Sequence, residues 1–87
     1  MTTPNKMRTK LKVFALKVVN QWDGTPVPDD ALREEMRDRF QSVMEADVSG
    51  SLRDAEQEGL LMGVRNDITK KITWTLTAKA IHALPTL

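Results

Sequence analysis

The chain of 87 residues contains no cysteine, only one histidine and no long apolar run. Without cysteine, disulfide bonds and thiolate metal sites are excluded. No apolar run approaches the roughly 18 residues that a membrane span needs, and no signal peptide is recognisable. We therefore expect a cytoplasmic protein without a membrane partner.

The residues that common catalytic sites need are also scarce. His82 is the only histidine, and no serine or carboxylate pair stands near it with the logic of a catalytic triad. Adjacent acids such as Asp29-Asp30 and Glu34-Glu35 diverge around a helix and form no carboxylate dyad. The four glycines form no phosphate-binding loop, and metal-ligand spacing is absent. We expect no enzyme, no cofactor and no metal.

The net charge of +1 conceals a segregation of charge along the chain. Residues 1–20 carry five cations and no acid, whereas residues 21–60 carry eleven acids and four arginines. Residues 61–87 are basic again, with four cations and one acid. Because the field near a surface depends on local charge, this asymmetry bears on the choice of partner.

The length predicts a single domain over residues 1–87, with residues 1–4 as a frayed tail. A first helix is expected over 5–21 because apolar side chains recur at helical spacing. These residues are Met7, Leu11, Phe14, Ala15, Val18 and Trp22. Asp23-Gly24 ends the helix, since glycine readily adopts the left-handed conformation found after helices.

Two further helices follow in the acidic middle of the chain. Proline and carboxylates at residues 28–30 suit a helix start, and apolar spacing continues to Met44, so the second helix is expected over 29–45. The third is expected over 48–58, ending at Gly59. Its start is left open between a cap by Asp47 and a capping box of Ser51 with Asp54.

The last third of the chain predicts a hairpin and a short helix. Residues 60–65 form an apolar strand, and Ile72, Trp74 and Leu76 alternate with polar residues in a second strand. This gives a hairpin over 60–77 and a helix over 78–84 capped by Thr77. Before the second helix, two prolines allow at most an edge strand. The four aromatic residues are interpreted as core: Phe14, Trp22, Phe40 and Trp74.

Two short motifs carry a family resemblance. LRDAEQEGLL at 52–61 and TWTLTAKA at 73–80 resemble segments of small bacterial regulators of the MarR and PadR type, within the winged helix-turn-helix superfamily. Such regulators often close the wing with Leu-Thr-x-Lys-Gly, where this chain has Ala80. The resemblance implies a mostly helical α+β fold: three helices, a two-stranded wing hairpin and a short C-terminal helix.

The resemblance also implies a partner, double-stranded DNA, and a role as a sequence-specific transcriptional regulator. The third helix would read the major groove through Ser49, Gly50, Arg53 and Gln57. The fork of Arg53 matches guanine, and the amide of Gln57 matches adenine. Wing residues Arg65, Lys70 and Lys71 would contact phosphates, as would Lys6 and Lys10.

Acidic residues on the third helix favour an alternative. Asp54, Glu56 and Glu58 share that helix with a single arginine, and carboxylates close to phosphates weaken binding. DNA binding by a single copy should then be weak and should need a second copy of the chain or a partner. The alternative function is a winged-helix protein-interaction module, whose acidic helical surface or basic first helix binds a protein partner. No cognate sequence or effector follows from the residues.

Overall fold

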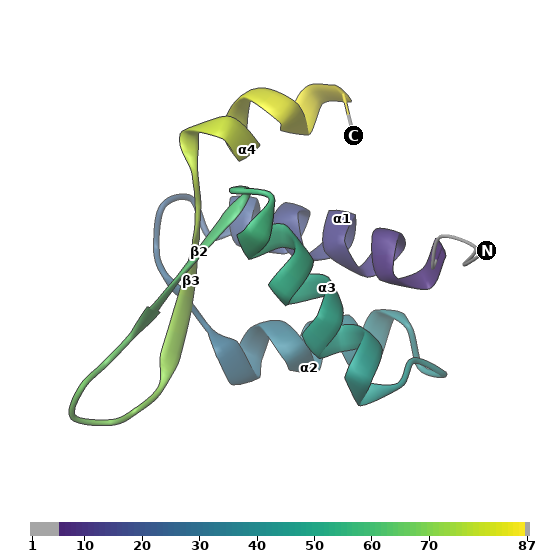
Figure 1. The fold of residues 1–87 in the computed structure, drawn as a ribbon, viewed down its shortest axis with the longest axis horizontal. Coiled ribbons are helices and arrows are strands. Elements are labelled where there is room, and N and C mark those ends of the chain that lie inside the picture. Colours follow the sequence, from purple (N-terminus) through teal and green to yellow (C-terminus); the bar gives the residue numbers. More distant parts are fainter. Residues whose placement is uncertain (1–5, 87) are drawn as a thin grey trace.

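The structure, a computed structural model, describes residues 6–86 and has three helices that lie on one side of a long hairpin (Figure 1). Helix α1 (Lys6–Gln21) runs across the middle, α2 (Asp29–Arg39) lies below it, and α3 (Glu45–Gln57) crosses in front. The short α4 (Ala78–Ala83) stands above α1 and continues as a 3-10 turn, η1 (Leu84–Thr86). The expected tail at 1–4 lies outside the described residues.

The sheet has three antiparallel strands in the order β1-β3-β2. Strands β2 (Leu61–Arg65) and β3 (Ile72–Leu76) form the predicted hairpin, with Gly63 opposite Trp74. Strand β1 (Val27–Pro28) pairs with the other side of β3 and lies at the edge, as the prolines required. The sheet thus ties the segment before α2 to the hairpin.

The core lies where α1, α2 and α3 meet the base of β3. Its largest fully buried side chains include Leu11, Leu16, Leu32 and Leu52, and Trp74 is 5% exposed. The prediction that Trp22 belongs to this core is wrong, because its side chain is 37% exposed. Trp22 ends the apolar stripe of α1, where the chain already turns away through positive φ at Asp23 and Gly24.

The boundary between the second and third helices differs from the prediction. Helix α2 ends at Arg39, not at residue 45, although the apolar spacing continues beyond it. Phe40 leaves the helix so that its ring meets the ring of Phe14 edge to face, with centroids 5.6 Å apart. Val43 packs on the core from a loop, and Met44 is 70% exposed.

Helix α3 consequently starts at Glu45, three residues before the predicted start. Its N-cap is Met44, so neither predicted cap is right. Asp47 lies within the first turn, where its charge suits the helix dipole. Ser51 is fully buried, and its hydroxyl donates to the carbonyl of Val48 at 2.8 Å.

The hairpin and the helix after it match the prediction more closely. The turn after β2 is organised by Asn66, whose Oδ1 accepts from the backbone N–H groups of Ile68 and Thr69. Lys70 adopts a φ of 62° and donates its N–H to the carbonyl of Asn66. Thr77 caps α4, its hydroxyl accepting from the N–H of Ala80 at 3.2 Å. Within residues 6–86, no helix is long and apolar enough to cross a membrane.

Candidate nucleic-acid interface

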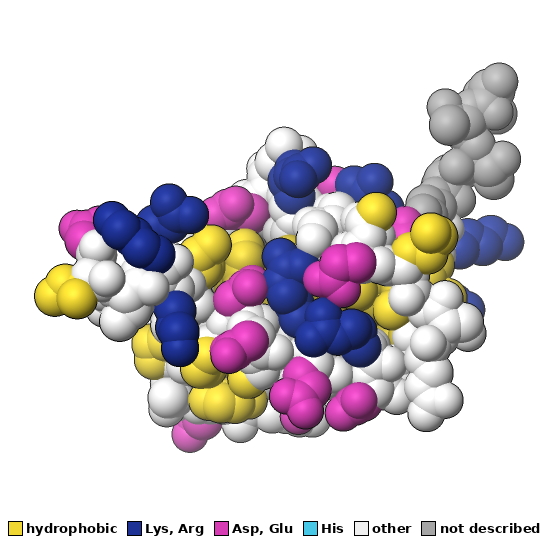
Figure 2. Space-filling view, turned by 90° about the horizontal axis from the view of Figure 1, so that it is seen from below, with side chains coloured by type: hydrophobic (Ala, Val, Ile, Leu, Met, Phe, Trp, Pro, Cys, Tyr) yellow, Lys and Arg dark blue, Asp and Glu magenta, His cyan; other side chains and the backbone are white. Residues whose placement is uncertain are grey.

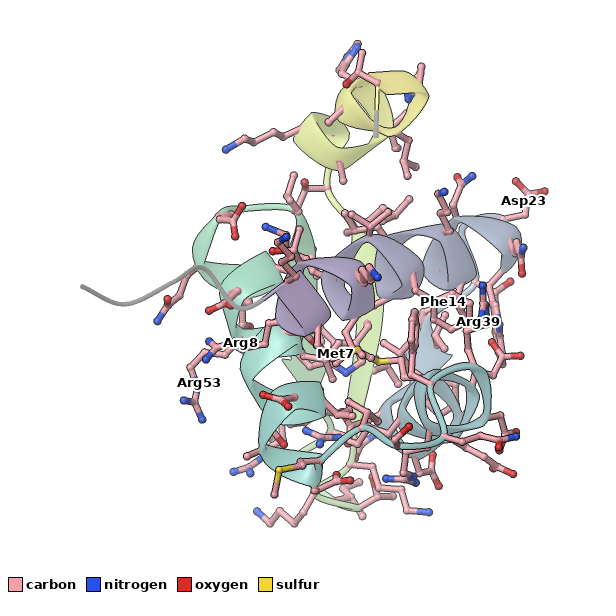
Figure 3. All side chains as sticks on the ribbon, turned by 90° about the vertical axis from the view of Figure 1, so that its right-hand side faces the viewer. Met7, Arg8, Phe14, Asp23, Arg39 and Arg53 are labelled. Carbon is pink, nitrogen blue, oxygen red and sulfur yellow. The ribbon has the colours of Figure 1, made fainter. Side chains whose placement is uncertain are left out.

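One side of α3 faces solvent. Arg53 and Gln57 are both exposed there, one helical turn apart, and Ala46 is exposed two turns earlier. Neither Arg53 nor Gln57 forms a side-chain hydrogen bond or an ion pair within the described residues. Figure 3 shows Arg53 projecting away from the body of the protein, beside Arg8. Both side chains, Arg53 and Gln57, are therefore available to a ligand.

The second predicted position on this face, Gly50, is not exposed. The guanidinium of Arg8 lies over it, donating from Nη2 to the Gly50 carbonyl at 3.3 Å and to Asp54 Oδ1 at 2.7 Å. Its Nε donates to Asp54 Oδ2 at 3.0 Å. A Cβ at Gly50 would lie 2.8 Å from Arg8 Cζ, so glycine leaves room for Arg8 and not for a ligand.

A second cation of α1 holds the end of α3. Lys12 Nζ donates to both carboxylate oxygens of Glu58, at 2.8 and 2.9 Å. Lys79 of α4 donates to the Glu58 backbone carbonyl at 2.7 Å. Asp54 and Glu58 are therefore turned sideways towards α1, and their charges are compensated within the protein.

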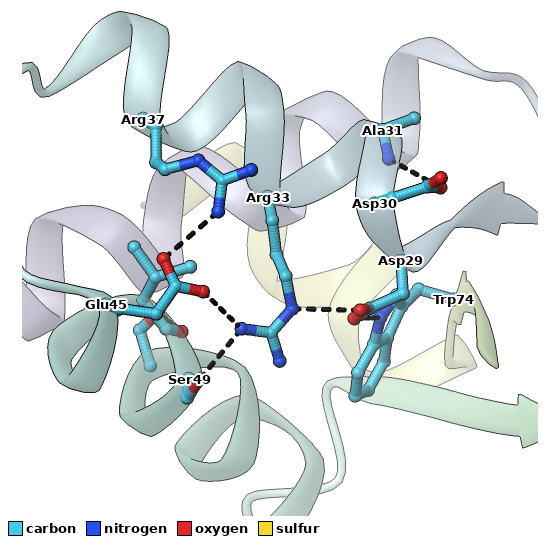
Figure 4. Close-up of polar contacts among 10 residues, drawn as sticks. Asp29, Asp30, Ala31, Arg33, Arg37, Glu45, Ser49 and Trp74 are labelled. Carbon is cyan, nitrogen blue, oxygen red and sulfur yellow. Dashed lines mark hydrogen bonds and ion pairs between the residues drawn. The ribbon is translucent and has the colours of Figure 1, made fainter. Parts of the chain in front are cut away.

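The start of α3 is attached to α2 by a similar network (Figure 4). Arg33 Nη1 donates to Glu45 Oε1 at 3.1 Å and to Ser49 Oγ at 2.7 Å, and Arg37 binds Glu45 Oε2 at 3.0 Å. Ser49, expected to point outward, is half-buried beneath Arg33. Glu45 near the start of α3, and Asp54 and Glu58 near its end, thus have cationic partners from neighbouring helices.

The same network reaches the sheet through Asp29. Arg33 Nε donates to Asp29 Oδ2 at 2.9 Å, and the indole Nε1 of Trp74 donates to Asp29 Oδ1 at 2.9 Å. The buried tryptophan therefore satisfies its polar group on α2. A continuous chain of polar contacts links β3, α2 and the N-terminus of α3.

The wing carries the other predicted cations. Arg65, Lys70 and Lys71 are all exposed around the turn between β2 and β3. Figure 2 shows Lys and Arg side chains gathered on the protruding hairpin at the left, whereas cations and acids alternate over the middle of this face. Ile68, at the tip of the turn, is 91% exposed. The wing is therefore the most evidently basic projection on this face.

The two remaining predicted residues, Lys6 and Lys10, are exposed on α1. Lys10 lines a groove with Phe14 and Arg39, and Figure 3 places Phe14 and Arg39 on the opposite side of α1 from Arg53. The structure therefore does not bring Lys10 together with the exposed face of α3. Conversely, sequence reasoning missed Arg8 and Arg33. The partners of Arg8 lie 42 and 46 residues away and leave no local signal, whereas Arg33 had one local signal, Asp29 four residues earlier on the same helix.

This arrangement of helices and hairpin is a winged helix-turn-helix fold. No protein-family model matches the chain, and no curated protein matches it. Among solved structures, it is similar to a transcriptional regulator from Clostridium thermocellum, Cth-833, with a TM-score of 0.73 at 10% identity. That superposition covers 99% of this chain and 84% of the other.

Two further solved structures share the fold. The transcriptional regulator YodB from B. subtilis, in its reduced form, has a TM-score of 0.60 at 17% identity, covering 99% of this chain and 84% of YodB. A single-substitution mutant of Lactococcus lactis ZitR has a TM-score of 0.63 at 14% identity, covering 99% of this chain and 54% of ZitR. At such low identities the likeness establishes the fold, and function must be argued from this chain's own surface.

Proposed function

We propose that this protein is a small cytoplasmic DNA-binding transcriptional regulator, with α3 in the major groove and the wing on phosphates. One observation carries the proposal. The acids Glu45, Asp54 and Glu58 of α3 are held by cations of neighbouring helices, whereas Arg53 and Gln57 face solvent without partners among residues 6–86. The helix therefore presents its base-reading groups and directs these carboxylates away from the same side.

The ion pairs reduce the repulsion that the acids of α3 would otherwise exert on DNA phosphates. An unpaired carboxylate within about 8–10 Å of a phosphate would weaken binding. Here Arg8 pairs with Asp54 and Lys12 with Glu58, and both Arg33 and Arg37 pair with Glu45. Glu56 remains exposed, but it lies beside Gly63 of β2.

The same pairing limits the supply of phosphate contacts, because a cation bound to a carboxylate contributes little to a second anion. The exposed cations that we assign to phosphate contacts are Lys6 of α1 and Arg65, Lys70 and Lys71 of the wing. So few contacts give weak binding by a single copy. We therefore include a homodimer in the proposal, with each copy reading half of the site.

The test is a titration with random duplex DNA at about 50 and 200 mM salt. Four phosphate contacts per copy predict a slope of log affinity against log salt of about −3.6, since each contributes roughly −0.9. Absence of binding at the lower salt, with the protein folded and concentrated, would contradict the proposal. That result would favour a protein-interaction module, for which the basic groove beside α1 supplies a specific surface.

A further inference from the structure

A groove separates α1 from the C-terminal end of α2, on the side away from Arg53 (Figure 3). Its volume is about 520 Å³. The side chains that define it come from the middle of α1, from the end of α2 and from the residue after it: Lys10, Val13, Phe14, Lys17, Arg39 and Phe40. Neither the exposed face of α3 nor the wing contributes to it.

The floor of the groove is aromatic. Phe14 and Phe40 are both half-buried and meet edge to face at an interplanar angle of 87°. The Arg39 guanidinium stands over the Phe40 ring, with Cζ 5.3 Å from the centroid. An apolar side chain entering the groove would therefore contact two rings already held in place by the core.

The rim of the groove is cationic. Lys10 and Lys17 are exposed, and within the described residues neither forms an ion pair or a side-chain hydrogen bond. Among residues 6–86, no carboxylate lines the groove. This distinguishes its cations from Arg8 and Lys12 of the same helix, which are engaged by α3.

The charge changes sign where the groove continues along α1. The adjoining hollow of about 340 Å³ is lined by Glu35 and Asp38 together with Phe14 and Arg39. The surface therefore has a cationic end and an acidic end joined by an aromatic floor. Such a pattern can fix the register of an acidic ligand, because its carboxylates are attracted at the cationic end and repelled at the acidic end.

We propose that this groove binds an acidic amphipathic segment of a partner protein, and that it does so while α3 and the wing are free to hold DNA. The partner's leucine or phenylalanine side chains lie on Phe14 and Phe40, and its Asp or Glu residues meet Lys10 and Lys17. Duplex DNA would meet the cations with its phosphates, but its bases are stacked inside the helix, so it offers no apolar group to the floor.

The dimensions suit a short segment. From Thr9 to Lys17 the helix rises about 12 Å, which matches roughly two turns of a bound helix. Anchors at i, i+3 or i+4, and i+7 would then span the floor. Charge pairs at an exposed rim are individually weak, so the apolar anchors must supply a substantial part of the affinity.

The proposal is tested with a fluorescein-labelled peptide of about 15 residues that has leucine and phenylalanine on one helical face and glutamates at the positions flanking that face. Fluorescence anisotropy should show binding to the wild-type protein. The Lys10→Ala/Lys17→Ala variant should bind the peptide roughly tenfold more weakly, from two exposed charge pairs. Its affinity for duplex DNA should stay the same.

The matched control is Lys70→Ala/Lys71→Ala, which removes the same charge from the wing. This control should keep peptide affinity and lose DNA affinity. Equal peptide affinity for the two double variants would overturn the proposal, as would absence of peptide binding to the folded wild-type protein. Because the peptide and DNA readouts are separate, failure of the DNA-binding proposal leaves this test interpretable.

Two further measurements test whether the groove binds something other than an acidic amphipathic segment. A peptide with the same glutamates but serine in place of its apolar residues should bind much more weakly, since the floor would be unused. If it binds equally well, the groove acts only as a cluster of charge and the proposal fails. If sedimentation shows a dimer that dissociates in Lys10→Ala/Lys17→Ala, the occupant is a second copy of this chain, which also overturns it.

Discussion

At the scale of single residues, the two arginines beside the exposed face of α3 have opposite roles. Arg53 is exposed and unpaired within the described residues, whereas Arg8 is bound to Asp54 and covers Gly50. The sequence offered Arg53 as a base reader because it lies on α3 itself. It could not offer Arg8, which approaches from a helix far earlier in the chain.

Arg53→Ala should lower affinity for a preferred site, chosen from a random duplex library, by about 1–3 kcal/mol. Affinity for random duplex should hardly change, and neither should the salt slope, because a lost base contact releases no counterions. Anisotropy titrations with both duplexes measure this. A uniform loss on both would show that Arg53 contacts phosphate.

The two tryptophans should give separable fluorescence signals. With Trp22→Phe, the remaining Trp74 should emit at short wavelength and resist acrylamide, because it is 5% exposed. With Trp74→Phe, the remaining Trp22 should be quenched readily, since it is 37% exposed. Trp74→Phe should also cost about 1–2 kcal/mol, as the bond to Asp29 is lost. Easy quenching of Trp74 would contradict the placement of β3.

At the scale of elements, α2 holds the start of α3 through Arg33. Arg33→Ala should lower the free energy of unfolding by about 1–2 kcal/mol, because bonds to Asp29, Glu45 and Ser49 are lost together. Arg37→Ala is the control: it removes one exposed pair with Glu45 and should cost about 0.5 kcal/mol or less. Urea unfolding of both variants decides the matter, and equal losses would show that Arg33 acts only as another surface cation.

The wing should act as a source of sequence-independent affinity. Lys70→Ala with Lys71→Ala should flatten the salt slope by about two units, since two phosphate contacts are removed. Affinity should fall alike for preferred and random duplexes. An unchanged slope would place the wing away from the DNA.

The hairpin could be predicted from sequence because its signals are local: strict alternation in β3, the Asn66 turn and the Thr77 cap. The end of α2 could not be predicted from the sequence. Phe40 and Val43 keep helical spacing but reach the core from a turn and a loop, where packing on Phe14 overrides the periodic pattern. The acids Glu45 and Asp47 were the available signal for an earlier start of α3.

At the scale of the whole molecule, the proposed homodimer has a direct test. A duplex with two preferred sites about 10 base pairs apart should be bound cooperatively, since both lie on one side of the helix. Moving one site by about half a turn should abolish the cooperativity. Gel-shift titrations distinguish the two duplexes. Independent binding at both spacings would show that single copies act alone.

One face of α3 packs against α1 and the other faces solvent, and this affects how substitutions on α3 can be tolerated. Positions 50, 54 and 58 are committed to α1, whereas Ala46, Arg53 and Gln57 touch no part of the fold through side-chain hydrogen bonds or ion pairs among residues 6–86. New side chains at these three outward positions can therefore be sampled with little loss of stability. If α3 contacts DNA as we propose, its outward positions can change by point substitution while the positions that pack on α1 stay the same.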